Sequence, residues 1–131
     1  MAIGAYQAYR KTQVETAGQL DLVIMLYDGA IKFAKLAAKM LREGDLEKTN
    51  GYLLRAQDIV SELMSSLNMD MGEIAEGLLK LYDYVDYCLV QANIKKDPAW
   101  IDQGLTVLTG LREAWMEIAR KPKGGEDVVP S

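Results

Sequence analysis

Four long stretches with helical periodicity, separated by breaks of only a few residues, constrain the fold of this chain more than any other feature of its sequence. Within each stretch apolar residues recur every three or four positions, as on one face of an amphipathic helix, and no segment alternates as a strand does. Because such short connections require neighbouring helices to run antiparallel, the pattern predicts an all-α fold, an antiparallel up-down four-helix bundle. A chain of 131 residues suits one such domain with a modest core.

The breaks carry signals that start and stop helices. Side chains that cap free backbone N–H groups precede several of the predicted helices, and glycine provides the left-handed turn that ends one of them. Along the chain these signals are a capping box over Thr16–Gln19, a stop at Gly44 after Arg42, an N-cap at Asp45, a stop over residues 68–72, a start near Glu73 and the N-cap and proline pair Asp97-Pro98. They predict an N-terminal segment over residues 1–15, a bundle domain over 16–120 and a disordered tail over 121–131.

Composition excludes several classes of function. The 15 basic and 19 acidic residues give a net charge of −4, and no block of Lys or Arg offers a surface for nucleic-acid phosphates. Histidine is absent, which excludes a di-iron bundle with Glu-x-x-His ligands and any Ser-His-Asp or Cys-His pair. There is no P-loop and no Gly-x-Gly-x-x-Gly motif. We therefore expect no enzyme, no catalytic residue, no cofactor and no metal site.

The sequence also lacks the features of a membrane or secreted protein. No apolar run approaches the roughly 20 residues of a membrane-spanning helix. The first residues contain no continuous apolar stretch of the kind found in secretion signals. The single cysteine, Cys88, excludes an internal disulfide, suits a reducing compartment and falls on an apolar stripe where we expect a small core residue. The expected location is the cytoplasm, without membrane insertion.

The first predicted helix is apolar on two sides, although a bundle helix needs only one apolar stripe. At ~100° per residue, one set of apolar side chains falls on a face that we expect in the seam of the bundle: Leu20, Val23, Ile24, Tyr27, Ile31, Ala34, Ala38 and Leu41. A second set clusters roughly 180° away and is called the second face: Leu22, Met25, Leu26, Gly29, Phe33, Leu36 and Met40. A narrow polar strip lies between the two faces: Asp21, Asp28, Lys32, Lys35 and Lys39.

Three interpretations of the second face stay open on the pattern alone. It belongs to the most buried helix of the bundle, it packs against a second copy in a dimer, or it forms a groove for a partner helix. Methionine and phenylalanine are adaptable anchors for helix-in-groove binding. Gly29 costs about 1 kcal/mol relative to alanine inside a helix, and a groove explains it if another backbone comes close. These last two observations favour the groove.

Each of the other three helices shows a single core stripe with apolar residues beside it. The predicted stripes are Leu46, Leu53, Ala56, Val60, Leu63 and Leu67 in the second helix, Ile74, Leu78, Leu81, Val85, Cys88 and Ala92 in the third, and Ile101, Leu105, Leu108, Leu111, Trp115 and Ile118 in the fourth. Tyr52 and Ile59 flank the stripe of the second helix, and Tyr82 and Leu89 flank that of the third. We include these four flanking residues with the second face as candidate partner-binding residues.

Six segments of the chain, taken in order, carry a resemblance to a known family. They are "TAGQLDLVIMLYDGAIKF", "GDLEKTN", "AQDIVSEL", "GEIAEGLLKLYDYV", "QANIKKD" and "LREAW". In this order and spacing the chain resembles the FliS family of flagellin export chaperones from Ile3 to about Ile118, with "MLYDGAI" and "LYDYV" followed by "QANIKKD" as the most specific parts. It departs from the family at Gly18-Gln19, where Ser-Pro is usual, and at Gly72, where members tend to have two glycines. Neither change touches the apolar faces.

The resemblance implies a cytoplasmic, non-catalytic chaperone of the flagellar type III export system. Such a protein binds the disordered C-terminal segment of flagellin in apolar grooves of a helical bundle, prevents its premature polymerisation and helps deliver it to the export apparatus. The family's N-terminal Ile-x-x-Tyr matches Ile3 and Tyr6, which joins these two residues to the candidate partner-binding residues. Residues 1–15 then have two interpretations, a removable lid over the groove or a frayed terminus.

A function of another class also stands beside this expectation. The second face suits a helical adapter or a homodimerisation module that binds another amphipathic helix. The sequence leaves open whether the protein is a monomer or a homodimer, and it predicts no nucleic-acid partner.

Overall fold

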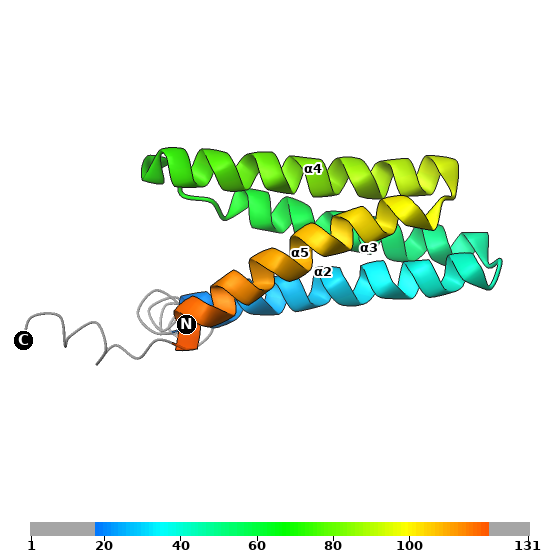
Figure 1. Ribbon diagram of the computed structural model, residues 1–131, viewed down its shortest axis with the longest axis horizontal. Helices are drawn as coiled ribbons and strands as arrows, with labels where there is room; N and C mark the ends of the chain where they lie inside the picture. The colour runs from blue at the N-terminus through cyan, green and yellow to red at the C-terminus, as the bar shows by residue number, and fades with distance from the viewer. Residues whose placement is uncertain (1–17, 121–131) are drawn as a thin grey trace, which may run out of the picture.

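A computed structural model gives the structure of residues 18–120, which fold into four α-helices and one short 3-10 turn (Figure 1). The helices are α2, Gln19–Arg42; α3, Leu46–Ser65; α4, Glu73–Lys95; and α5, Pro98–Arg120, with the turn η2, Met69–Met71, before α4. The all-α four-helix bundle expected from the sequence is confirmed over this range. None of these helices is long and apolar enough to cross a membrane. The predicted N-terminal segment, the predicted N-cap Thr16 of the first helix and the predicted tail over 121–131 lie outside the described residues. In the structure Gly18 stands at the N-cap of α2, without a side-chain hydrogen bond.

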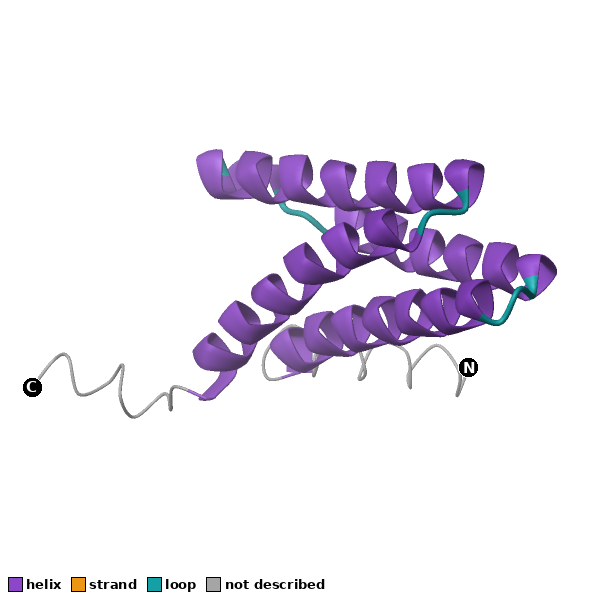
Figure 2. Cartoon of the chain, turned by 45° about the vertical axis from the view of Figure 1, so that its right-hand side comes forward, coloured by secondary structure: helices purple, strands orange, loops and turns teal. Residues whose placement is uncertain are grey.

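The helices run alternately up and down, and each packs against two neighbours. α2 contacts α3 and α5, and α4 contacts the same two helices (Figures 1 and 2). Both α3 and α5 cross the bundle diagonally: α5 starts beside the C-terminal end of α4 and ends beside the N-terminal end of α2. At that end of the molecule α3 lies with α4, α2 lies with α5, and the two pairs of helices are spread apart.

Capping side chains fix two helix starts as the sequence predicts. The Asp45 carboxylate accepts a hydrogen bond from the backbone N–H of Lys48 at 3.0 Å, at the start of α3. The Asp97 carboxylate accepts one from the backbone N–H of Ala99 at 2.9 Å, at the start of α5. α4 begins at Glu73, also as predicted.

Two glycines adopt a positive φ, which other residues rarely reach, at the breaks. Gly44, with φ 83°, follows α2, and Gly72, with φ 69°, separates η2 from α4. α3 ends at Ser65, a few residues earlier than predicted. The reason is a separate turn, since the Asn68 side chain accepts a hydrogen bond from the Asp70 backbone N–H at 3.0 Å and starts η2.

All four helices contribute fully buried side chains to one core. These include Tyr27, Ala30, Ala34 and Ala37 from α2, Leu53, Ala56 and Val60 from α3, Val85, Cys88, Leu89 and Ala92 from α4, and Ile101 and Leu108 from α5. Small residues let the helices approach: a Cβ on the buried Gly104 of α5 would lie 3.6 Å from the Cβ of Cys88 on α4. α5 is therefore held close to α4 at Gly104, before the two helices diverge.

Four residues predicted in the core stripes are exposed instead: Leu46, Ile74, Leu81 and Ile118. The first and last of them lie in terminal turns, where fewer neighbours cover a helix. In α4, Ile74 is 64% exposed and Leu81 39% exposed, whereas Tyr82 and Leu89, expected beside the stripe, are buried. Successive helical residues are ~100° apart, so a modest rotation of α4 about its axis exchanges these neighbouring faces. The predicted stripe of α4 is wrong at these positions.

Candidate functional site

The inner part of the second face of α2 packs against α3. Leu26 and Phe33 are partly buried against the core. The Phe33 ring stacks on Tyr52 of α3 with ring centroids 6.0 Å apart, and the Arg55 guanidinium lies 5.5 Å from the Phe33 centroid. This part of the second face is therefore buried helix surface, the first of the three interpretations. A contribution of Leu26 and Phe33 to partner binding stays a prediction.

Gly29 also serves the contact with α3. A Cβ built on Gly29 would lie 3.0 Å from the Cδ1 atom of Ile59, which is tighter than nearly all Cβ contacts. The glycine makes room for a side chain of the same bundle, whereas the sequence suggested that it admits the backbone of a partner. This contact accounts for the glycine, and the approach of a partner's backbone stays a prediction.

The outer part of the second face is open to solvent. Met25 is 66% exposed and Leu22 is 43% exposed. Leu36 and Met40, further along α2, are half-buried. Among the predicted residues of α2, these four offer apolar surface to a partner without any rearrangement of the bundle.

The remaining predicted residues have different positions. Leu89 is fully buried in the core, and Tyr82 is 2% exposed. Ile59 of α3 is partly buried, with its Cδ1 atom against Gly29 of α2. Ile3 and Tyr6 lie outside the described residues, so their assignment stays a prediction.

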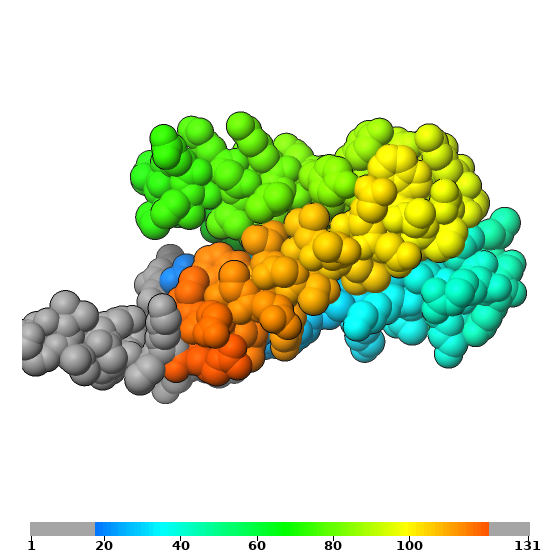
Figure 3. Space-filling view, in the orientation of Figure 1, coloured from blue at the N-terminus to red at the C-terminus, as the bar shows by residue number. Residues whose placement is uncertain are grey.

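An apolar cleft of about 360 Å³ lies at the end of the bundle where the two helix pairs are spread apart. Figure 3 shows the surface hollowed between the N-terminal half of α4 and the C-terminal half of α5. Leu20 and Val23 of α2 form part of its wall, with Leu67 and Met71 from the α3–α4 connection and Leu78 of α4. We call this the end cleft.

Sequence reasoning missed the end cleft. Most of its lining, including Val23, Leu67 and Trp115, has the periodicity of core residues and was assigned to the core stripes. The periodicity is correct, but the helices diverge at this end and leave these side chains incompletely covered. A weak signal was present in the apolar Met69 and Met71, which flank an aspartate in a break between helices.

A hydrogen-bond chain connects three helices beside the end cleft. The indole Nε1–H of Trp115 on α5 donates to the Tyr27 hydroxyl of α2 at 3.1 Å. The hydroxyl oxygens of Tyr27 and Tyr82, on α2 and α4, are 2.6 Å apart. Burial raises the pKa of both tyrosines above the ordinary value of 10.0, so both hydroxyls are neutral at physiological pH. Tyr82 and Trp115 line the end cleft, and Tyr27 lies behind them.

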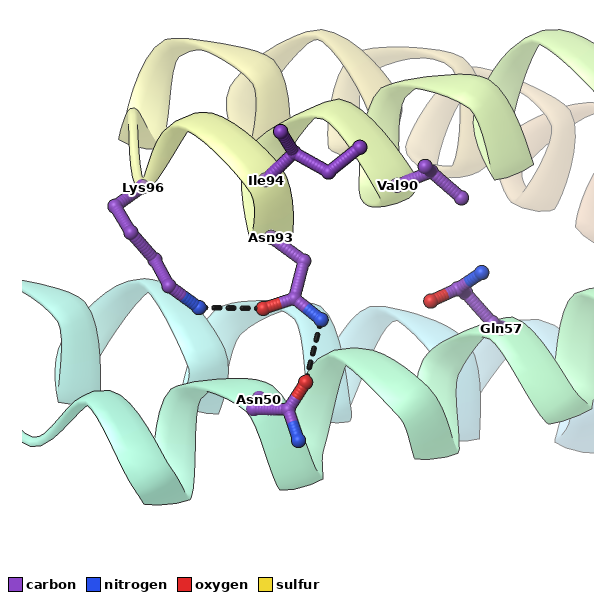
Figure 4. Close-up of a pocket in the computed structure, with 6 residues that line it drawn as sticks. All are labelled: Asn50, Gln57, Val90, Asn93, Ile94 and Lys96. Atoms are coloured by element: carbon purple, nitrogen blue, oxygen red, sulfur yellow. Dashed lines mark hydrogen bonds between the residues drawn. The ribbon is translucent and has the colours of Figure 1, made fainter.

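A second groove, between α3 and α4, is lined by four polar side chains together with Val90 and Ile94 (Figure 4). The Asn93 side chain donates to the Asn50 side-chain oxygen at 2.5 Å and accepts from the Lys96 ammonium at 2.5 Å. Nearby, the Gln57 amide donates to the Asp86 carboxylate at 3.1 Å. These groups satisfy one another and join the two helices. Asn93 belongs to the "QANIKKD" segment, which therefore helps to join α4 to α3.

The polar strip of α2 borders a third, open groove. Lys32, Lys35 and Lys39 are exposed and line it together with Arg42 and Asp28. Asp28 forms an ion pair with Arg112 of α5, and this hydrogen bond raises the pKa of the guanidinium. The pair joins α2 to α5 along the solvated side of the bundle.

Residues 18–120 form no metal-binding cluster. This part of the chain contains no group of three or more His, Cys, Asp or Glu side chains that could hold a metal ion. Cys88 is buried, and burial raises the pKa of its thiol, which keeps it protonated and unreactive. The end cleft and the outer part of the second face, both apolar, are the candidate site.

The fold places this protein in the class of all-helical bundles that includes a flagellar chaperone of known structure. That crystal structure, described as a flagellar chaperone from bacteria, matches with a TM-score of 0.76 and 20% sequence identity. The match covers 93% of this chain and 100% of the other. The likeness concerns the arrangement of the helices.

Comparison of sequences gives a more particular assignment. The family model described as flagellar protein FliS matches residues 2–122, so the chain belongs to the FliS family. The flagellar secretion chaperone FliS of Bacillus subtilis (strain 168) is 38% identical over 86% of this chain and 84% of its own length. Those of Vibrio cholerae (33% identity, 88% of each chain) and Salmonella typhimurium (34% identity, 88% of this chain and 90% of the other) are similar over the same extent. The resemblance noted in the sequence is confirmed.

Proposed function

We propose that this protein is a cytoplasmic, non-catalytic chaperone that binds the disordered C-terminal segment of flagellin. Holding that segment prevents premature polymerisation and aids delivery of flagellin to the type III flagellar export apparatus. Membership in a family of flagellar secretion chaperones supports the chaperone role. The apolar surfaces of the bundle support a polypeptide as the bound partner.

The observation that carries the proposal is the apolar surface left open around the first turns of α2. Leu20 and Val23 line the end cleft, while Leu22 and Met25, on the same turns, face solvent. An isolated bundle gains nothing from two open apolar surfaces, which promote self-association. A disordered segment that folds on binding requires such surfaces, because broad apolar burial must offset the entropy lost on ordering.

Methionine side chains on both surfaces suit a client of variable sequence. Met25 is exposed on the outer part of the second face, and the exposed Met71 lines the end cleft. The flexible, polarizable thioether adapts its shape to different apolar groups. Contacts of this kind give affinity without demanding one client sequence.

From the sequence we also propose that residues 1–15 act as a removable lid. An empty apolar groove favours self-association, and a segment of the same chain, with Ile3 and Tyr6, is available to cover it. A lid competes with the client, so the free energy of seating the lid is subtracted from the observed affinity. The tail over residues 121–131 is proposed to be dispensable for stability.

Calorimetric titration of the full-length protein with a C-terminal flagellin peptide from the same organism tests the proposed function. A saturable complex is expected, together with an increase in peptide helicity measured by circular dichroism. A scrambled peptide of the same composition, which keeps the apolar content but not its order, is the matched control and should not bind. Equal binding of both peptides, or of neither, would reject flagellin as the client.

A further inference from the structure

The hydrogen-bond chain beside the end cleft has one more donor than it has bonds. The Trp115 indole N–H can only donate, so the Tyr27 oxygen accepts it. One hydroxyl proton then fills the 2.6 Å bond between Tyr27 and Tyr82. Three protons thus serve two bonds, and one hydroxyl proton has no acceptor within this chain of three side chains.

Burial decides which hydroxyl keeps the spare proton. Tyr27 is fully buried and does not line the end cleft, so a spare proton there would be a buried donor without a partner, which proteins avoid. Tyr82 is only 2% exposed, but unlike Tyr27 it lines the cleft, where water or a ligand can accept a hydrogen bond. Tyr27 therefore donates to Tyr82, and the Tyr82 hydroxyl proton is free to donate into the cleft.

Tyr82 is one of the few residues with a polar side-chain group in the largely apolar lining of the cleft. The other uncharged polar side chains of the lining, Gln19, Ser66 and Asn68, are exposed and lie at helix ends. Two of them are already engaged, since Ser66 donates to the Leu63 carbonyl at 2.8 Å and Asn68 accepts from the Asp70 backbone. A polypeptide entering this cleft brings main-chain carbonyl groups, which need hydrogen bonds once they leave water.

We propose that, in the complex, the Tyr82 hydroxyl donates a hydrogen bond to a main-chain carbonyl oxygen of the bound segment, whose apolar side chains fill the end cleft on either side. The inference rests on the proposed function. The last carbonyls of a helix have no partner within the helix. The group that fits best is therefore the carbonyl at the C-terminal end of a helical turn of the client.

This hydrogen bond gives the end cleft a property that apolar contact lacks. Hydrophobic burial is non-directional, so by itself it tolerates a client segment that slides along the cleft. A single donor at a fixed point selects the position at which the helical turn of the client ends. Tyr82 is thus a specificity-determining residue that sets the register of the bound segment.

The substitution Tyr82→Phe tests the inference, because it removes the hydroxyl and keeps the ring. Affinity for the flagellin C-terminal peptide should fall about tenfold, which corresponds to the free energy lost with one hydrogen bond in a shielded site. Tyr84→Phe is the matched control, since Tyr84 lies on the same helix and donates to Gln103 of α5 at 2.6 Å. Its affinity should stay within about twofold of the wild-type value.

An ester scan of the peptide identifies the acceptor. Replacing one backbone amide at a time by an ester weakens the carbonyl as an acceptor at that position. At one position the ester should weaken binding to the wild-type protein severalfold and have little further effect on the Tyr82→Phe variant. If Tyr82→Phe does not fold, which its thermal melt shows, a single sensitive position against the wild type supports a main-chain carbonyl as an acceptor, and the absence of any sensitive position rejects the inference.

The outcomes separate this inference from the proposed function. If the wild-type protein does not bind the peptide, the proposed function is wrong. If the wild type binds and Tyr82→Phe binds equally well, the function stands and the Tyr82 donor is rejected. A weaker variant without any coupled ester position rejects a main-chain carbonyl as the acceptor.

Discussion

Gly29 of α2 and Ile59 of α3 fit each other closely, since a Cβ on the glycine would lie 3.0 Å from the Ile59 Cδ1 atom. Gly29→Ala gains about 1 kcal/mol of helix propensity but must displace that methyl group. We expect the gain to be largely cancelled in the wild type and to appear in the Ile59→Val background, which lacks Cδ1. Urea denaturation of the four proteins in this double-mutant cycle measures the coupling. Equal effects of Gly29→Ala in both backgrounds would show that the contact is not limiting.

Met25 and Phe33 should respond differently to a charge, although the sequence grouped them on one face. Met25→Asp should leave the free energy of unfolding within about 0.5 kcal/mol of wild type, because the side chain is exposed. It should weaken flagellin-peptide binding about fivefold or more. Phe33→Asp should destabilise the fold by roughly 2 kcal/mol or more, because its ring stacks on Tyr52.

Ile94→Asp is the control for Met25→Asp. Ile94 is equally exposed but lies on α4, away from the end cleft and from the second face of α2. Denaturation and calorimetry should find both its stability and its peptide affinity unchanged. A similar loss of affinity in both variants would mean that overall charge, and not the α2 surface, governs binding.

Stability should fall as the pH rises above about 10. Burial raises the pKa of Tyr27 and Tyr82 above 10.0 in the folded protein. Near that pH the unfolded chain loses protons that the folded chain keeps, so this contribution to stability is complete below pH 10 and is lost above it. Urea denaturation across a pH series measures the loss. The Tyr27→Phe variant should lose less over the same range, and an equal loss would assign the alkaline unfolding to other groups.

The Asn93 side chain should contribute to the free energy of unfolding but not to the affinity for the client peptide. Its side chain bonds both Asn50 and Lys96 between α3 and α4. Asn93→Ala should lower the free energy of unfolding by about 1–2 kcal/mol and leave peptide affinity unchanged, as measured by denaturation and calorimetry. A lower affinity with unchanged stability would instead place this polar groove in the binding surface.

Removal of residues 1–10 tests the proposed lid. The truncated protein should bind more of an apolar dye or form more dimer, because the groove loses its cover. Its affinity for the flagellin peptide should be equal or tighter, since the lid no longer competes. Light scattering and calorimetry provide the two measurements. Lower affinity without a change in self-association would mean that the segment contacts the client or the export apparatus directly.

Helix boundaries could be predicted because their causes lie within a few residues. Asp45 and Asp97 cap the helices that follow them, and Gly44 adopts the left-handed backbone that its position suggested. The rotation of α4 could not be predicted in this way. Ile74 and Tyr82 both fall near the apolar stripe, and only packing against α3 and α5 decides that Tyr82 is the buried one.

The site was predicted only in part, for a related reason. Met25 and Leu22, on the second face predicted from the sequence, are exposed. Phe33 and Gly29 lie on the same face but contact α3. The end cleft arises from the angle between helix pairs, which is a tertiary property. A residue such as Val23 has the same periodicity whether the helix opposite is near or far.

Because α5 runs diagonally, the core of the domain is not fully covered at the end where α5 finishes. Leu108 is the last fully buried residue of α5. After it, Leu111 and Trp115 pack against the core but are only partly buried. The final turns of α5 are therefore the least firmly held part of that helix and should be the first to open. In the proposed complex the bound segment supplies the missing cover, so chaperone and client share a single interior. Binding of the client then raises the free energy of unfolding of the chaperone, which is lower when the end cleft is empty.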